Sequence, residues 1–282
     1  MFEAGLLKTK RILITGGGTG LGRAMAQRFL ELGATVYICG RRAEVLRQTC
    51  DELTRQTNGT IHGFPCDVRD SIAVETMIDA IWGEAPINVL VNNAAGNFLA
   101  RTEELSPRAW EAVLGIVLTG AINLTMSCGR RWLQAGQSAA VLNVSTTYAA
   151  SGSGSAYVVP SAVAKAGVMA LTTSLAVEWG PRGIRLNGIA PGPIPTEGAF
   201  SRLLPSKDVE RQAIKGIPLR RFGTLEEFAN LAAFLVSDGC TYINGEIVVM
   251  DGGEWLQGAG EFSGLGQQLT DADWQALRPQ KK

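Results

Sequence analysis

Residues 11–22 read RILITGGGTGLG, a short apolar segment that runs into a cluster of glycines. Residues 11–15 are rich in β-branched side chains and predict a strand, whereas residues 20–32 have helical periodicity and end at Gly33. A glycine-rich turn between a strand and a helix brings free backbone N–H groups and the positive end of the helix dipole together, and this arrangement binds phosphate. The predicted phosphate site consists of Gly16, Gly18, Thr19, Gly20, Leu21 and Gly22, unless the segment is only a turn.

Strand and helix patterns alternate through the rest of the chain. Further strands are predicted at 35–39, 60–66, 89–92, 139–144, 185–189 and 246–250, and helices at 43–57, 71–82, from 106 onward, 161–179 and 224–235. Such alternation is typical of an α/β fold with a doubly wound parallel sheet of the Rossmann type. We therefore expect a single domain over residues 1–253, followed by a tail, 254–282, on the surface or in a subunit contact. The insertion 203–216 suits a helical lid.

Composition narrows the class of protein. The formal net charge is zero, which gives no basis for binding nucleic acid. No run of about 18 uninterrupted apolar residues predicts a membrane span, and residues 1–10 lack the pattern of a signal peptide. Five cysteines without a CxxC motif suit a reducing, cytoplasmic setting. With His62 as the single histidine, a histidine-based metal site or a Ser-His-Asp triad is not expected, and no metal is predicted.

The end of the second predicted strand bears on the choice of dinucleotide. An acidic residue there would bind the ribose hydroxyls of NAD, but this chain has Arg41 and Arg42. Two guanidinium groups suit the 2′-phosphate of NADP, through bidentate charge-assisted hydrogen bonds. The pair favours NADP(H), although it also suits the solvated start of a helix.

The glycine spacing TGGGTGLG resembles that of the short-chain dehydrogenase/reductase family. Matching motifs follow in order at 66–68 (CDV), 92–96 (NNAAG), 191–194 (PGPI) and 251–253 (DGG), so the resemblance covers residues 8–253. It implies an oxidoreductase that transfers a hydride. It also implies cofactor contacts from Asp67 and Val68 at the adenine, from Asn93 and Ala94, and from Pro191, Gly192, Ile194 and Lys165 toward the nicotinamide end.

One position departs from the family pattern. The family carries Tyr-x-x-x-Lys on its long helix, and here Ser161 stands in the tyrosine position while Lys165 remains. Tyr148, just past the fifth predicted strand, and Tyr157, in the following loop, are the nearby phenols.

The segments 92–98 (NNAAGNF), 145–148 (STTY) and 160–167 (PSAVAKAG) resemble the mitochondrial-type 2,4-dienoyl-CoA reductases. This resemblance implies that Tyr148 and Asn97 stabilise a thioester oxyanion, that Ser161 and Lys165 complete the site, and that water protonates carbon. It further implies an acyl-CoA substrate and a homotetramer, with the acyl-CoA contacted by Arg69, Phe98, Ser106 and Arg202. Because the loop between Tyr148 and Ser161 is slightly longer here, Tyr157 stays an alternative. Other open functions are an enoyl-CoA or 3-oxoacyl thioester reductase, or an NADP(H)-binding regulator without turnover.

Overall fold

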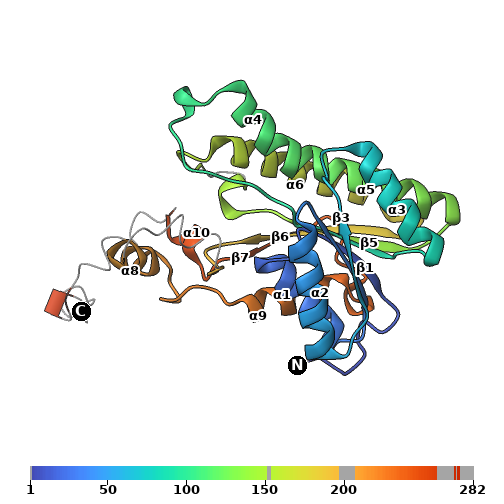
Figure 1. The fold of residues 1–282 in the computed structure, drawn as a ribbon. Coiled ribbons are helices and arrows are strands. Elements are labelled where there is room, and N and C mark those ends of the chain that lie inside the picture. The colour runs from blue at the N-terminus through green and yellow to red at the C-terminus, as the bar shows by residue number, and fades with distance from the viewer. Residues whose placement is uncertain (1, 151–153, 197–206, 259–269, 271, 274–282) are drawn as a thin grey trace.

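The computed structural model describes residues 2–150, 154–196, 207–258, 270 and 272–273 (Figure 1). Seven strands form one sheet in the order β3-β2-β1-β4-β5-β6-β7, and every neighbouring pair is parallel. The strands are β1 (Arg11–Thr15), β2 (Thr35–Gly40), β3 (Ile61–Pro65), β4 (Val89–Asn92), β5 (Ala139–Val144), β6 (Ile184–Pro191) and β7 (Ile247–Met250). The strand order reverses between β1 and β4, which is where ligands bind in doubly wound sheets. The predicted fold class is confirmed.

Helices cover both faces of this sheet. They are α1 (Gly20–Glu31), α2 (Ala43–Thr57), α3 (Ser71–Glu84), α4 (Pro107–Leu114), α5 (Gly120–Ala135), α6 (Val159–Trp179), α8 (Lys207–Gly216), α9 (Leu225–Val236) and α10 (Glu254–Gly258). In Figure 1, α1, α2 and α9 lie below the sheet and α3 to α6 above it. Ile12 and Ile14 of β1 join the core on the first face, and Leu13 joins the core on the second. A strand covered on both faces must be apolar where it is buried, which explains the unbroken apolar run at 12–14 (ILI).

A buried polar network fixes the carboxyl ends of the central strands. Asn92 Nδ2 donates to Thr125 Oγ1 at 2.9 Å and to Asn143 Oδ1 at 2.8 Å, and Asn143 Nδ2 donates to Thr172 Oγ1 at 2.8 Å. These bonds tie β4 and β5 to α5 and α6. Hydrogen bonds are strong in a low-dielectric interior, so these bonds hold the strand ends that carry the site in register, although the buried Asn92 Oδ1 has no partner in the described part of the chain.

The predicted helix from residue 106 onward is one rod with an irregular turn. Ser106 caps α4, a π-helical turn covers Gly115–Thr119, and α5 continues to Ala135.

Two helical stretches, Pro107–Ala135 and Val159–Arg182, are long and apolar enough to cross a membrane by length and composition. About half of each apolar window is buried within this fold, as in core helices of soluble proteins. Within the insertion 203–216, for which a helical lid is predicted, α8 covers 207–216 and residues 203–206 lie outside the described residues; the role of a lid stays a prediction.

We expect Gly129→Ala to destabilise the protein. A Cβ on Gly129 of α5 would lie 2.3 Å from Cη2 of Trp179, the last residue of α6, whose side chain is buried in the core. Overpacking of this kind costs about 1–3 kcal/mol of unfolding free energy, measurable by denaturant unfolding. Gly83→Ala is the matched control, because a Cβ there meets nothing within 4 Å. Equal stability of the two variants would contradict this packing.

Candidate active site

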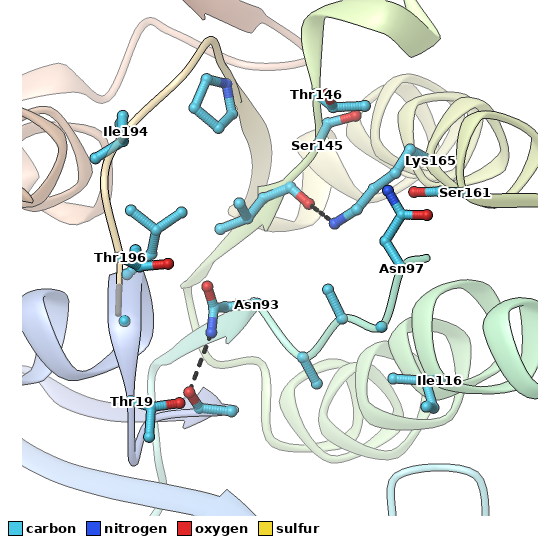
Figure 2. A pocket seen from close by; sticks show the side chains of 18 of the residues that line it. Thr19, Asn93, Asn97, Ile116, Ser145, Thr146, Ser161, Lys165, Ile194 and Thr196 are labelled. Atoms are coloured by element: carbon cyan, nitrogen blue, oxygen red, sulfur yellow. Dashed lines mark hydrogen bonds between the residues drawn. The ribbon is translucent and has the colours of Figure 1, made fainter. Parts of the chain in front are cut away.

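A cavity of about 1080 Å³ opens at the carboxyl edge of the sheet (Figure 2). Its wall runs from the glycine loop after β1, past the ends of β2 to β6, to the start of α10. Because all seven strands are parallel, the loops after their carboxyl ends gather at this one edge. The cavity is large enough for a dinucleotide with part of a second molecule.

The glycine loop forms the phosphate end of the cavity. Gly16 and Gly20 have φ of +65° and +53°, a conformation that side chains rarely adopt, and a Cβ on Gly16 would lie 3.2 Å from Ala94 Cα. Thr19, the N-cap residue of α1, makes no side-chain capping bond, so the first N–H groups of that helix are left for a ligand. The predicted residues Gly16, Gly18, Thr19, Gly20 and Leu21 line the cavity. Gly22 does not line it; a Cβ there would lie 2.3 Å from the Gly16 carbonyl oxygen, so this glycine lets helix and loop pack closely.

The loop after β4 is fastened to the glycine loop through Thr15. The Thr15 hydroxyl oxygen accepts hydrogen bonds from the backbone N–H groups of Asn93 and Ala94, both at 2.9 Å. Asn93 Nδ2 in turn donates to the carbonyl oxygens of Thr15 at 2.9 Å and Gly16 at 3.3 Å (Figure 2). These contacts explain why the chain places threonine before the glycines and asparagine after β4. Both Asn93 and Ala94 line the cavity, as predicted cofactor contacts should.

Charged residues gather at the far end, beyond β2 and β3. Arg41 and Arg42 are exposed and line the cavity, and Arg42 is the N-cap residue of α2. Asp67 and the buried Val68 also line it. The guanidinium of Arg69 forms an ion pair with Asp67 at 2.5 Å, and this hydrogen bonding holds the pKa of the Asp67 carboxyl below its usual value. This end of the cavity therefore presents the two exposed guanidinium groups of Arg41 and Arg42, of which Arg41 also interacts electrostatically with Asp67.

Three predicted catalytic side chains meet at the other end. The Tyr148 hydroxyl lies 3.0 Å from Ser161 Oγ, and Asn97 Nδ2 donates to Tyr148 Oη at 3.3 Å. A short 3-10 turn, Thr147–Ala149, directs Tyr148 inward from the end of β5. The Asn97 amide is oriented by its own Oδ1, which accepts a hydrogen bond from Phe98 N at 2.9 Å. Tyr157 does not line the cavity; it is 59% exposed and its φ is +67°.

Lys165 lies beneath this cluster. Its ammonium group donates to the Val144 carbonyl oxygen, and the residue is 6% exposed (Figure 2). Burial disfavours the charged form and lowers the pKa of Lys165 to about 8. The side chain reaches the cavity from the long helix α6, one turn beyond Ser161, so both face the same wall.

The wall opposite this cluster is formed by the loop after β6. Pro191, Gly192 and Ile194 all line the cavity, and Gly192 N donates to the Met250 carbonyl oxygen at 2.9 Å, which docks the loop on the end of β7. The predicted site omits further lining residues, among them Ser145, Thr196, Glu254 and Trp255. The sequence could have indicated these residues, because they adjoin the end of β5, the PGPI segment and the DGG segment. Ser145 Oγ is buried without a hydrogen-bond partner in the described part of the chain.

Three of the four predicted acyl-CoA contacts, Arg69, Phe98 and Ser106, do not line the cavity. Arg69 is bound to Asp67, and the Ser106 hydroxyl caps α4 by accepting from Ala109 N at 3.3 Å. Phe98 is 38% exposed and does not line the cavity, and Arg202 lies outside the described residues. These four assignments stay predictions. Among the described residues no group of three or more His, Cys, Asp or Glu side chains could hold a metal ion.

Comparisons with known proteins agree with this geometry. The family model described as enoyl-(acyl carrier protein) reductase matches residues 16–254. A Bacillus subtilis protein named probable 2,4-dienoyl-CoA reductase [(2E)-enoyl-CoA-producing] is 44% identical over 253 residues, covering 89% of this chain and 98% of its own. A Caenorhabditis elegans protein named probable 2,4-dienoyl-CoA reductase 3 [(3E)-enoyl-CoA-producing] is 46% identical over 255 residues, covering 89% and 82%.

Solved structures extend the comparison. A short chain dehydrogenase from Bacillus anthracis superposes with a TM-score of 0.79 at 41% identity, covering 88% of this chain and 97% of its own. A gluconate 5-dehydrogenase from Burkholderia cenocepacia, solved in complex with NADP and tartrate, superposes with a TM-score of 0.82 at 28% identity, covering 88% and 96%.

Replacing Lys165 by methionine should remove a pH dependence of stability. The folded-state pKa of about 8 lies below the unfolded value near 10.4, so between these pH values the unfolded chain binds more protons. The unfolding free energy of the wild type should therefore rise, relative to Lys165→Met, by about 3 kcal/mol as pH increases through this window. Denaturant unfolding of the cofactor-free proteins from pH 7 to 10.5 measures it. Lys8→Met, at an exposed lysine, is the control. If the unfolding free energy changed with pH in the same way in all three proteins, the lowered pKa of the buried Lys165 would be refuted.

Proposed function

The chain belongs to the short-chain dehydrogenase/reductase family, and we propose that it is an oxidoreductase that reduces 2,4-dienoyl-CoA thioesters with a hydride from NADPH. The observation that carries this is the contact of Asn97, Tyr148 and Ser161 above the buried Lys165. The names of the relatives from Bacillus subtilis and Caenorhabditis elegans support the same substrate class.

The arrangement suits a conjugated thioester. When bound, NADPH supplies a hydride to a carbon remote from the thioester, so negative charge accumulates on the thioester oxygen. Tyr148 O–H and the second N–H of Asn97 can donate to that oxygen, as an oxyanion hole does. When Ser161 donates to the phenol oxygen, the proton of Tyr148 is free for this bond. Lys165 favours an electron-rich phenol and is placed to hold the nicotinamide ribose.

The position of the phenol separates this chemistry from ketone reduction. A ketone needs a proton at the oxygen that becomes a hydroxyl, and the family places a tyrosine on the helix beside the lysine for that purpose. Here that helix position holds Ser161, and the phenol comes from the end of β5 instead. Tyr157, the phenol that a 3-oxoacyl reductase would use here, is exposed and does not line the cavity. An enoyl thioester reductase is the second candidate, which the description of the matching family model favours.

The cofactor preference for NADP(H) rests on Arg41 and Arg42. Both line the cavity at its far end, where a 2′-phosphate would lie, and no described carboxylate from the end of β2 competes for them. The NADP in the solved gluconate 5-dehydrogenase complex supports the same class of cofactor.

The oligomeric state and the cellular location are also proposals. Apolar side chains exposed on the helical layer, Ile122 of α5 and Val163 and Val177 of α6, support a homotetramer. All five cysteines are free, which supports a cytoplasmic enzyme, and the zero net charge supports action without a nucleic-acid partner. We also propose that it works without a membrane, since the two apolar helices pack on the sheet.

The substrate assignment predicts NADPH oxidation with a dienoyl-CoA, and little with an enoyl-CoA or a 3-oxoacyl-CoA. Absorbance of NADPH follows each reaction. Tyr148→Phe should lower kcat with the dienoyl-CoA by about 10²–10³, the usual effect of removing one oxyanion donor. Tyr157→Phe, the matched control, should keep wild-type turnover. Oxidation with the enoyl-CoA alone would move the assignment to the second candidate, and unchanged turnover of Tyr148→Phe would remove the phenol from the mechanism.

Removing the guanidinium group of Arg41 or of Arg42 should weaken the binding of NADPH but not that of NADH. Hydrogen bonds to charged groups contribute about 1.5–3 kcal/mol, so we expect Arg41→Ala and Arg42→Ala to raise the KM for NADPH by about 10- to 100-fold. The KM for NADH should barely change, because NADH lacks the 2′-phosphate. Arg47→Ala is the control, since Arg47 lies on the outer side of α2 with Glu44 and Asp51. A parallel loss for both dinucleotides would argue against a 2′-phosphate contact.

A further inference from the structure

Reduction of a conjugated thioester consumes a proton as well as a hydride, and the oxyanion donors do not deliver that proton to carbon. The other acidic side chains on the cavity wall are Cys39, Cys66, Asp67 and Glu254. The first three lie at the adenine end, on or beyond β2 and β3, and Asp67 is held as a carboxylate by Arg69. Only Glu254, among the described lining residues, is an unassigned acid beside the nicotinamide loop.

We propose that Glu254 is the general acid that protonates carbon in this reaction, in place of bulk water. The inference rests on the proposed function, because it needs a reduced thioester whose carbon must be protonated. It concerns the second half of the reaction, after the negative charge has formed on the thioester oxygen.

The backbone brings Glu254 to the cavity from a distant part of the sequence. It is the first residue of α10, four residues after β7, and β7 is paired with β6 through Pro191 and Met250. Its Oε2 lies 3.3 Å from the point that a Cβ on Gly192 would occupy. The carboxyl group therefore rests against the backbone of the loop that faces Tyr148 and Lys165 across the cavity.

Within the described part of the chain, the surroundings leave this carboxyl group without a partner. No hydrogen bond or ion pair joins its side chain to another residue in the described ranges, whereas the neighbouring Asp251 accepts from Gly253 N and Trp255 N, both at 2.8 Å. Two basic side chains of the segment that follows α8 are bound elsewhere: Arg220 donates to the Lys215 carbonyl oxygen and Arg221 pairs with Glu227. A carboxyl group that is half-buried and unpaired is best accommodated in its neutral form.

The titration of Glu254 agrees with that geometry. Burial raises the pKa of Glu254 above its usual value, and the negative charge of Asp251 raises it further. A raised pKa leaves more of the protonated form near neutral pH, which is what a general acid needs.

The proposed step balances. The hydride has already formed a C–H bond at the remote carbon with its own electron pair, and the displaced π electrons of the conjugated thioester have moved to the thioester oxygen. The thioester carbonyl then re-forms, a conjugated carbon takes the proton from the Glu254 O–H bond, and the electrons of that bond remain on the carboxylate. Solvent reprotonates the carboxylate before the next turnover.

The test compares the wild type with Glu254→Gln and, as a conservative variant, Glu254→Asp, all at full length with NADPH and a dienoyl-CoA. General acid catalysis contributes about 10²–10⁴, so we expect Glu254→Gln to lose at least 10²-fold in kcat and Glu254→Asp to recover part of it. In Glu254→Gln the solvent deuterium isotope effect should rise, and the isotope effect of 4-deuterated NADPH should fall toward one, because protonation becomes limiting. The exposed Glu246→Gln, just before β7, should behave as the wild type.

The pH profile gives a further readout. Activity that depends on protonated Glu254 falls as pH rises through the pKa of this residue, so the rate of the wild type should decline there. Glu254→Gln should not show this decline. It should keep any decline near pH 8 that comes from Lys165. Infrared difference spectra of the cofactor-free wild type against Glu254→Gln should show a protonated carboxyl band at a pH where ordinary glutamates are ionised.

Two results would overturn the inference. Wild-type kcat with unchanged isotope effects in Glu254→Gln would return protonation to water. A loss of activity accompanied by a matching loss of NADPH affinity, measured by fluorescence titration, would make Glu254 a residue that positions the nicotinamide loop. If the wild type itself does not reduce the dienoyl-CoA, the proposed function fails and this inference fails with it.

Discussion

The hydroxyl of Thr15 joins the two loops on which the whole site is built. By accepting the N–H groups of Asn93 and Ala94, it fixes the loop after β4 against the glycine loop after β1, at the point where the strand order reverses. The glycine loop then has the shape that admits phosphate, and the same β4 loop continues to Asn97 at the reacting end. One buried hydroxyl thus couples the glycine loop to the position of Asn97, the proposed oxyanion donor. Such coupling requires a rigid sheet beneath it, which the Asn92 and Asn143 network provides.

Moving the phenol from the long helix to the end of β5 changes what the site can do. With Ser161 on the helix and Tyr148 facing it, the hydroxyl groups lie 3.0 Å apart, and Asn97 adds a third polar group from the β4 loop. Three elements therefore converge on one oxygen position, which suits stabilising charge on a thioester oxygen better than delivering a proton to a ketone. Lys165 stays in the family position, so the helix still serves the cofactor and the phenol together.

Acid–base properties differ along one cavity because the environment differs along it. The ion pair with Arg69 keeps Asp67 ionised at the adenine end, burial lowers the pKa of Lys165, and burial next to Asp251 raises the pKa of Glu254. Neutral and charged forms are thus distributed by desolvation and by the nearest charge rather than by residue type. Sites that separate the pKa values of their groups in this way are suited to acid–base chemistry.

The sequence by itself determined the sheet, the phosphate loop and the cluster of Asn97, Tyr148, Ser161 and Lys165. Strand bounds such as Arg11–Thr15 and Val89–Asn92 were predictable because fully buried strands are apolar throughout, and this signal is local. The catalytic cluster came from motif resemblance, which carries spatial information that composition lacks.

Only the tertiary structure shows that Tyr148 lines the cavity and that the exposed Tyr157 does not, since both lie close to Ser161 in sequence. It also showed that Arg69 is bound to Asp67, a contact that depends on how a short loop folds back. Glu254 was assigned to a tail by sequence, but the pairing of β6 with β7 sets it against Gly192, about sixty residues earlier in the chain. Contacts between segments so far apart leave no periodic pattern in the sequence, because they are fixed by the packing of the whole sheet.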